Sequence, residues 1–191
     1  MKSTVFALFT LFCVLPWVAH ADAPAGDSAL GTRSYDDFET NQTCLECHVN
    51  IVPQYEQSLM SQSFTHHWDE IEYFKLALPH AEKFAKVAGV KAGCNGCHAP
   101  LAFLAGDIPP GRPAEGTRAN EGVSCDLCHS ITGFAGDVPF NFNYIVQPGP
   151  AKQGVREGTE SPVHAIQANP FLMSAEFCGT CHNEKDPWGQ W

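Results

Sequence analysis

The sequence predicts a mainly α-helical protein with long irregular loops and little regular sheet. Residues 53–78 carry apolar side chains at helical spacing, in a pattern that includes Phe64, Trp68, Ile71 and Leu78. Elsewhere, stretches rich in Gly and Pro separate four short segments that contain cysteine pairs. Few of these stretches have a periodic apolar face. Side chains alone therefore offer only a small core, and we expect another component to organise the fold.

The expected helices lie in the first half of the chain. Pro79 should interrupt the helix over 53–78, because proline lacks an amide hydrogen. A second helix is expected from His80 to about Val90, ended by the glycine-containing stretch before Cys94.

Three further segments are expected to be irregular. Residues 22–40 are rich in small and acidic side chains and look like a flexible leader. Residues 99–122 and 133–163 are expected to be loops, the second with one small hairpin around 143–146. A loop of about thirty residues in a compact domain is expected to cover something.

The first 21 residues have the features of a signal peptide. Lys2 gives a positive start, residues 5–18 are almost wholly apolar, and Ala19-His20-Ala21 fits the cleavage rule. The apolar run is short for a membrane span, which needs about 20 residues. We therefore expect a periplasmic or secreted protein whose folded domain covers 41–191, and Cys13 and His20 are excluded from the site.

The charge balance restricts the partners. The chain has 11 Lys and Arg against 21 Asp and Glu, a net charge of −10, and loss of Lys2 with the signal peptide gives 10 − 21 = −11. Such a chain is not expected to bind nucleic acid, and it favours partner proteins with a basic docking surface. Membrane association is expected only through a partner.

The eight remaining cysteines occur in four units of one form, Cys-x-x-Cys-His. Every cysteine after residue 21 belongs to one of them: Cys44, Cys47, Cys94, Cys97, Cys125, Cys128, Cys178 and Cys181. The histidine that ends each unit is His48, His98, His129 or His182.

This motif is the attachment site of haem c. A two-residue gap on a helical turn puts both sulfurs on one side, where they can reach the two vinyl groups of the macrocycle. The following histidine then projects beneath the ring and can bind the iron. Paired cysteines can also hold zinc, act as redox dithiols or form disulfides, but none of these uses requires a histidine after each pair. The sequence therefore predicts four covalently attached haem c groups, which would supply the core and nucleate the fold.

Other residues are candidates for the second axial position of each iron. The histidines outside the motifs in the expected mature chain are His66, His67, His80 and His164. His66 and His67 point about 100° apart on a helix, so both would serve only if two haems flanked that helix. Met60 lies seven residues before His67 on the same face and is a further candidate, since methionine also binds haem iron.

Several segments resemble the cytochrome c-554 type of the multihaem cytochromes c. The similarity covers most of 44–184, and the segments that carry it are 44–48, 55–60, 121–129, 161–164 and 174–182. It implies a multihaem cytochrome c fold and a tetrahaem electron carrier of the kind that accepts electrons from hydroxylamine oxidoreductase. His164 matches the family's distal histidine after Ser-Pro. Met60 stands where the family has a distal histidine, which leaves methionine ligation, a shifted ligand at His66 or His67, or an open iron.

Three classes of function are compatible with these features. We expect an electron carrier rather than an enzyme, because four haems in so short a chain form a continuous path for electrons. The alternatives are an oxidoreductase with one open iron that acts on a small nitrogen or sulfur compound, and a subunit of an extracellular cytochrome filament. The aromatic stretch that ends at Trp191 looks like the start of a segment, so we expect the chain to be truncated or to lack a C-terminal module.

Overall fold

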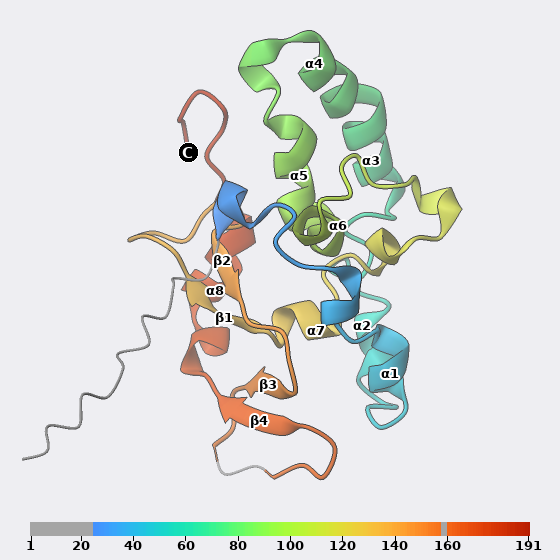
Figure 1. Ribbon diagram of the computed structural model, residues 1–191, viewed down its shortest axis with the longest axis vertical. Coiled ribbons are helices and arrows are strands. Elements are labelled where there is room, and N and C mark those ends of the chain that lie inside the picture. The colour runs from blue at the N-terminus through green and yellow to red at the C-terminus, as the bar shows by residue number, and fades with distance from the viewer. Residues whose placement is uncertain (1–24, 158–159) are drawn as a thin grey trace, which may run out of the picture.

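The computed structural model describes residues 25–157 and 160–191, shown in Figure 1. The predicted signal peptide and residues 22–24 of the predicted leader lie outside the described residues, as does the side chain of Trp68. As predicted, the fold is mainly helical with long irregular connections and two small sheets.

Short helices make up most of the regular structure. The α-helices are α1 (Asn41–Leu45), α2 (Val52–Tyr55), α3 (His67–Glu70), α4 (Leu78–Lys83), α5 (Val90–His98), α6 (Pro100–Ala105), α7 (Cys125–Cys128) and α8 (Ala175–His182). The 3-10 helices are η1 (Gly26–Ala29), η2 (Tyr35–Asp37), η4 (Ala85–Val87), η5 (Pro113–Glu115), η6 (Arg118–Glu121) and η7 (Pro170–Met173), and η3 (Ile71–Ala77) is a π-helix.

Two sheets of two strands each lie in the second half of the chain. β1 (Ile131–Phe134) pairs antiparallel with β2 (Tyr144–Val146), and β3 (Ala151–Gly154) pairs in parallel with β4 (Ala165–Ala168). A hairpin is present near the expected position: β2 is its second strand, and a nine-residue connection, residues 135–143, joins it to β1.

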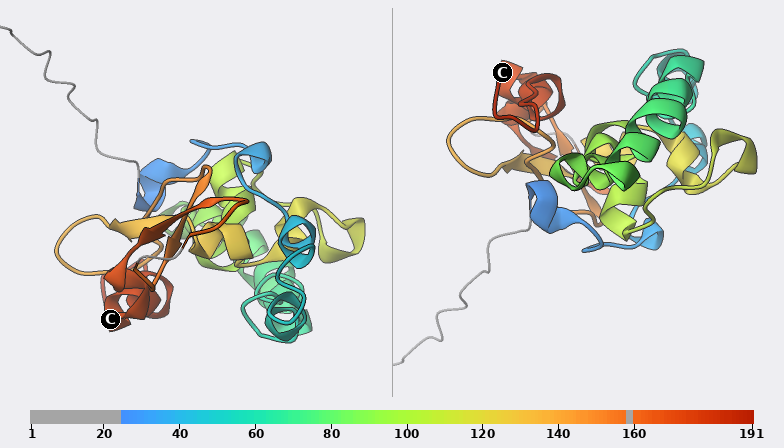
Figure 2. Two further views of the ribbon diagram at one scale, coloured as in Figure 1. Left: turned by 90° about the horizontal axis from the view of Figure 1, so that it is seen from below. Right: turned by 90° about the horizontal axis from the view of Figure 1, so that it is seen from above.

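The molecule has a helical part and a strand-bearing part. In Figure 1, α3, α4 and α5 stand together at one end, whereas β3 and β4 lie at the other end. The two views of Figure 2 also place the strands with α8 on one side and the α3–α4 rod on the other. α7 lies between the two parts, close to β1.

A modest side-chain core joins the two parts. Its centre is α6, where Leu101, Phe103 and Leu104 are at most 1% exposed, and Tyr144 of β2 packs into the same cluster. Residues 99–122 were predicted to form a loop, and this prediction is wrong for α6. The helix has no polar face to produce a periodic pattern, because it is apolar throughout and buried on all sides.

The helix expected over 53–78 is not continuous. α2 ends at Tyr55, turns follow, and the rod begins again at His67. Pro79 does not interrupt this rod, because the preceding π-helix shifts the backbone pairing: the amide of Leu78 donates to the carbonyl of Tyr73, five residues back. A turn paired in this way accommodates the missing amide hydrogen of Pro79.

Two other expectations also fail. The helix expected from His80 to about Val90 is divided, since α4 ends at Lys83 and η4 follows, and a new helix, α5, begins at Val90 and runs through Gly93 into the second cysteine motif. Residues 25–40 of the expected leader are packed: Ala29 and Phe38 are 1% and 3% exposed, and Arg118 donates to the Phe38 carbonyl at 3.2 Å. The apolar side chains in this segment are too few to raise its mean hydropathy, but they reach the core.

Candidate haem attachment sites

Each of the four cysteine motifs lies on one helical turn. In the first, the amide of His48 donates to the Cys44 carbonyl at 2.8 Å, and in the third His129 donates to Cys125 at 3.0 Å. The second motif ends α5 and the fourth ends α8. This is the backbone that the motif chemistry requires, because it places two sulfurs and an imidazole around one site.

Hydroxyl side chains begin three of these turns. Thr40, Ser124 and Ser174 each accept a hydrogen bond from an amide three residues on, at 3.2–3.3 Å. Such caps satisfy amides that a short helix leaves unpaired. The second motif has no side-chain cap and instead uses the longer helix α5, so the four turns are stabilised in two different ways.

The ring nitrogens of two motif histidines are already oriented. Nδ1 of His129 lies 2.7 Å from the carbonyl of Gln153, and Nδ1 of His98 lies 3.0 Å from the carbonyl of Ser63. A metal-bound histidine typically donates its other ring N–H to such an acceptor. Both contacts therefore leave Nε2 as the nitrogen for iron.

The motif sulfurs lie close together in pairs. The thiol of Cys125 donates a hydrogen bond to Cys44, which lowers the pKa of Cys44 to about 7 and raises the pKa of Cys125 well above its usual range. The thiol of Cys97 donates to Cys181 in the same way, so the pKa of Cys97 is raised and that of Cys181 is lowered. The first motif thus lies beside the third, and the second beside the fourth.

Further contacts connect these two pairs of motifs. Burial, together with the charges of Cys181 and Cys178, raises the pKa of Cys128 to about 12. Tyr144, 1% exposed, donates to the carbonyl of Gly96 at 2.7 Å and lies within electrostatic range of Cys97, Cys128 and Cys181. The second, third and fourth motifs therefore surround one buried phenol.

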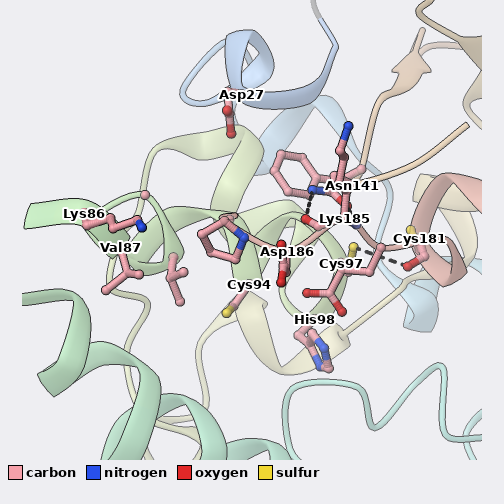
Figure 3. A pocket seen from close by; sticks show the side chains of 16 residues that line it. Asp27, Lys86, Val87, Cys94, Cys97, His98, Asn141, Cys181, Lys185 and Asp186 are labelled. Atoms are coloured by element: carbon pink, nitrogen blue, oxygen red, sulfur yellow. Dashed lines mark hydrogen bonds between the residues drawn. The ribbon is translucent and has the colours of Figure 1, made fainter. Parts of the chain in front are cut away.

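A cavity of about 320 Å³ adjoins the second motif. Figure 3 shows Cys94, Cys97 and His98 on its wall, with Cys181 of the fourth motif next to Cys97. Lys86, Lys185 and Asp186 also line the cavity, so charged side chains surround an interior bordered by sulfur and apolar atoms.

The residues present fit covalent haem c at these positions. The eight motif cysteines are free thiols, and all four motif histidines are exposed. Within residues 25–157 and 160–191, no group of three or more His, Cys, Asp or Glu side chains converges as a metal cluster.

The candidate distal ligands are distributed unevenly. The ring of His164 lies near that of His48, with centroids 6.4 Å apart and ring planes at 30°. His66 and His67 lie 4.8 Å apart by their ring centroids, and His80 packs against Phe84. Met60 is 43% exposed. The roles of His66, His67, His80 and Met60 stay predictions.

Three charged residues near the motifs were not identified from the sequence. Asp69 lies 3.2 Å from Nδ1 of His98. Asp126, inside the third motif and 1% exposed by its side chain, forms an ion pair with Lys152 at 2.6 Å. The position of Asp126 between two motif cysteines is a signal in the sequence, whereas nothing in the sequence connects Asp69 to His98.

Four Cys-x-x-Cys-His turns arranged in this way are typical of multihaem c-type cytochromes. Comparison with known proteins agrees: residues 43–130 match the family model described as cytochrome c554 and c-prime. The predicted relationship to the multihaem cytochromes c is thereby confirmed.

The fold is similar to that of a penta-haem cytochrome c552 from Thermochromatium tepidum. The TM-score is 0.53 at 19% sequence identity, over 83% of this chain and 49% of that one, so the chain spans about half the length of the solved structure. No curated protein sequence matches the chain. Among the described residues, no helix has the length and apolar character to span a membrane.

Proposed function

We propose that the chain carries four haem c groups and transfers electrons between partner proteins in the periplasm. The observation that carries this proposal is the arrangement of the four motifs, each on one helical turn and each with a sulfur beside another motif. The haems would be attached through the eight motif cysteines, with His48, His98, His129 and His182 as proximal iron ligands.

The spacing of the attachment points supports transfer between haems. Cys44 lies beside Cys125, and Cys97 lies beside Cys181. Cys128 is close enough to Cys178 and Cys181 of the fourth motif to interact with them electrostatically. When bound, haem c supplies a one-electron ferric–ferrous couple. The residues of this chain fix the attachment points close to one another and surround them with the buried side chains of α6, β1 and β2. The sequence order of the motifs therefore differs from their order in space, in which the third lies between the first and the fourth.

His164 is the proposed distal ligand opposite His48. The ring centroids of His164 and His48 are 6.4 Å apart, a separation that would allow both imidazoles to hold one iron. Nδ1 of His164 lies 3.1 Å from the carbonyl of Ala165, which leaves Nε2 for the iron. The β3–β4 pairing holds this histidine in place, because β4 begins at the next residue.

The acidic chain is proposed to dock on basic partner proteins. The net charge of −10 would become more negative with the propionates of bound haem. Complementary charges mainly raise the rate of association, and salt screens them. The association rate with a basic redox partner should therefore fall as ionic strength rises.

Haem content tests the proposal directly. A pyridine haemochrome assay and the intact mass of the secreted protein should both give four covalent haems per chain. A mass equal to the bare polypeptide would overturn the proposal. A count below four would show that at least one motif carries no haem, and would overturn the tetrahaem assignment.

A second experiment tests the pairing of His164 with His48. The His164→Ala variant should keep all its haems, because attachment uses only the motif residues. One haem should become high-spin by electron paramagnetic resonance and bind carbon monoxide when reduced. The neighbouring Val163→Ala, at a side chain 74% exposed, should show neither change. A fully low-spin His164→Ala protein would exclude this residue as a ligand.

A further inference from the structure

Asp69 lies against the histidine of the second motif. Its Oδ1 is 3.2 Å from Nδ1 of His98, and the backbone carbonyl of Ser63 is 3.0 Å from the same nitrogen. One ring N–H thus faces two acceptors, of which one is an ionisable carboxylate. Asp69 and His98 also line the same hollow of about 170 Å³, together with Phe64 and Tyr73.

The surrounding chain holds this carboxylate in place. Asp69 belongs to α3, which continues directly into the π-helix η3. The guanidinium of Arg112 lies 4.5 Å from the ring centre of Phe74 on that helix and 3.7 Å from the carboxylate of Glu70. The side chain of Asp69 is 24% exposed, so water screens it only in part.

No permanent cation neutralises Asp69 among the ion pairs of the described residues. Its two partners there are histidines, His98 and, at 3.9 Å, His66. The adjacent Glu70 differs, because it is paired with Arg112. The negative charge of Asp69 therefore acts on the imidazole of His98.

We propose that Asp69 is a positioning residue that lowers the reduction potential of the haem on the second motif. This inference rests on the proposed function, in that His98 must bind iron. A carboxylate that accepts the Nδ1–H bond makes the imidazole a stronger donor, and a stronger donor stabilises ferric over ferrous iron. His129 of the third motif bonds a neutral carbonyl at the same ring position, so the two haems should differ in potential.

The test is the set of midpoint potentials of the holoprotein, obtained by spectroelectrochemical titration. Asp69→Asn keeps the size and an oxygen acceptor but removes the charge. It should raise the potential of one haem by about 59 mV, which corresponds to a tenfold change in a one-electron equilibrium, the lower end of the effect of outer-shell partners. The midpoint potentials of the other three haems should change by only a small fraction of this shift.

Glu70→Gln is the matched control, because it removes the same charge one residue along. It should move the potential of that haem much less, since Glu70 contacts Arg112 and not a motif histidine. Asp69→Glu, which retains the charge, should shift the potential less than Asp69→Asn. The nuclear magnetic resonance signals of the His98 ring should change in Asp69→Asn and not in Glu70→Gln.

Two outcomes would overturn the inference: four unchanged potentials in Asp69→Asn, or equal shifts in Asp69→Asn and Glu70→Gln. Haem counting separates its failure from failure of the proposed function. If peptide mapping finds no haem on Cys94 and Cys97 of the wild-type protein, the proposed function fails at that motif. If the haem is present and its potential ignores Asp69, only the inference fails. If Asp69→Asn does not retain the haem, Asp69→Glu is compared with wild type instead. Changed resonances of the His98 ring in Asp69→Glu would support the contact, and unchanged resonances would overturn the inference.

Discussion

The second and third cysteine motifs have the same chemistry on different supports. Both hold a histidine whose Nδ1 faces a backbone carbonyl, Ser63 for His98 and Gln153 for His129. The second motif has an acidic residue directly on its imidazole, Asp69. In the third motif the acidic residue lies between the cysteines.

The acidic residue of the third motif, Asp126, is neutralised by an ion pair. Lys152 forms an ion pair with its Oδ1, and its Oδ2 accepts the backbone amide of Glu39 at 2.8 Å. The carboxylate of Asp69 thus contacts a motif histidine, whereas that of Asp126 connects β3 and the N-terminal segment to α7. Under the proposed function, two motifs of the same Cys-x-x-Cys-His form would therefore hold haems of different potential, because the charges beside their histidines differ.

The largest expected effect tests what the two motifs share. Cys125→Ala with Cys128→Ala, and separately Cys94→Ala with Cys97→Ala, should each remove one haem, because thioether bonds need the thiols. Intact mass should fall by one haem in both proteins. An unchanged haem count in either variant would show that the altered motif carries no covalent haem.

The next effect separates the two acidic residues. Lys152→Met leaves the buried Asp126 without its cation and should destabilise the holoprotein by about 3–5 kcal/mol, measured by urea unfolding. The exposed Lys75→Met is the control and should change the free energy of unfolding by less than about 0.5 kcal/mol. Asp69→Asn should affect stability less than Lys152→Met, since Asp69 is partly exposed. Equal losses from these two variants would remove the distinction between a structural and an electrostatic carboxylate.

A third prediction concerns the position before the second cysteine of each motif. Leu127 fills it in the third motif and is 1% exposed, whereas Gly96 fills it in the second. A Cβ on Gly96 would lie 2.3 Å from the ring of Phe142, so Gly96→Ala should cost about 1–3 kcal/mol by overpacking.

Gly89→Ala is the control for this prediction, because a Cβ there meets nothing within 4 Å. Thermal unfolding of the holoproteins should distinguish the two variants. If Gly96→Ala is as stable as Gly89→Ala, Phe142 does not pack on the second motif as described.

The smallest effect concerns the caps. Ser124 is fully buried and accepts the amide of Leu127, so Ser124→Ala should cost about 1 kcal/mol. Ser174→Ala removes the equivalent cap of the fourth motif at a less buried site and should cost less. Urea titration of both variants compares them, and a larger loss for Ser174→Ala would contradict the role of burial.

Much of the candidate site follows from local sequence. The Cys-x-x-Cys-His units form helical turns because each needs only residues that are neighbours in the chain, together with a hydroxyl cap such as Ser124 or Ser174. The mainly helical fold and the relationship to multihaem cytochromes c were predicted for the same reason, since the motifs that carry them are contiguous.

The elements that were predicted wrongly depend on packing against segments that are distant in the sequence. α6 lacks a polar face because it is buried on all sides by residues from other segments. The rod from His67 to Lys83 passes Pro79 by means of a π-helix, which no propensity indicates. Residues 25–40 pack through a few apolar side chains and the guanidinium of Arg118.

The sequence by itself determined which atoms can attach and ligate haem, because that chemistry resides in five consecutive residues. Only the tertiary structure decided which motifs are neighbours, that His164 faces His48, and that Asp69 touches His98 while Lys152 neutralises Asp126. These relations join residues 26 to 116 positions apart, and their geometry depends on how α6, the π-helix and the β3–β4 pair bring distant segments together. Electrostatic interactions act through space, so the charges that distinguish one haem site from another are fixed by packing.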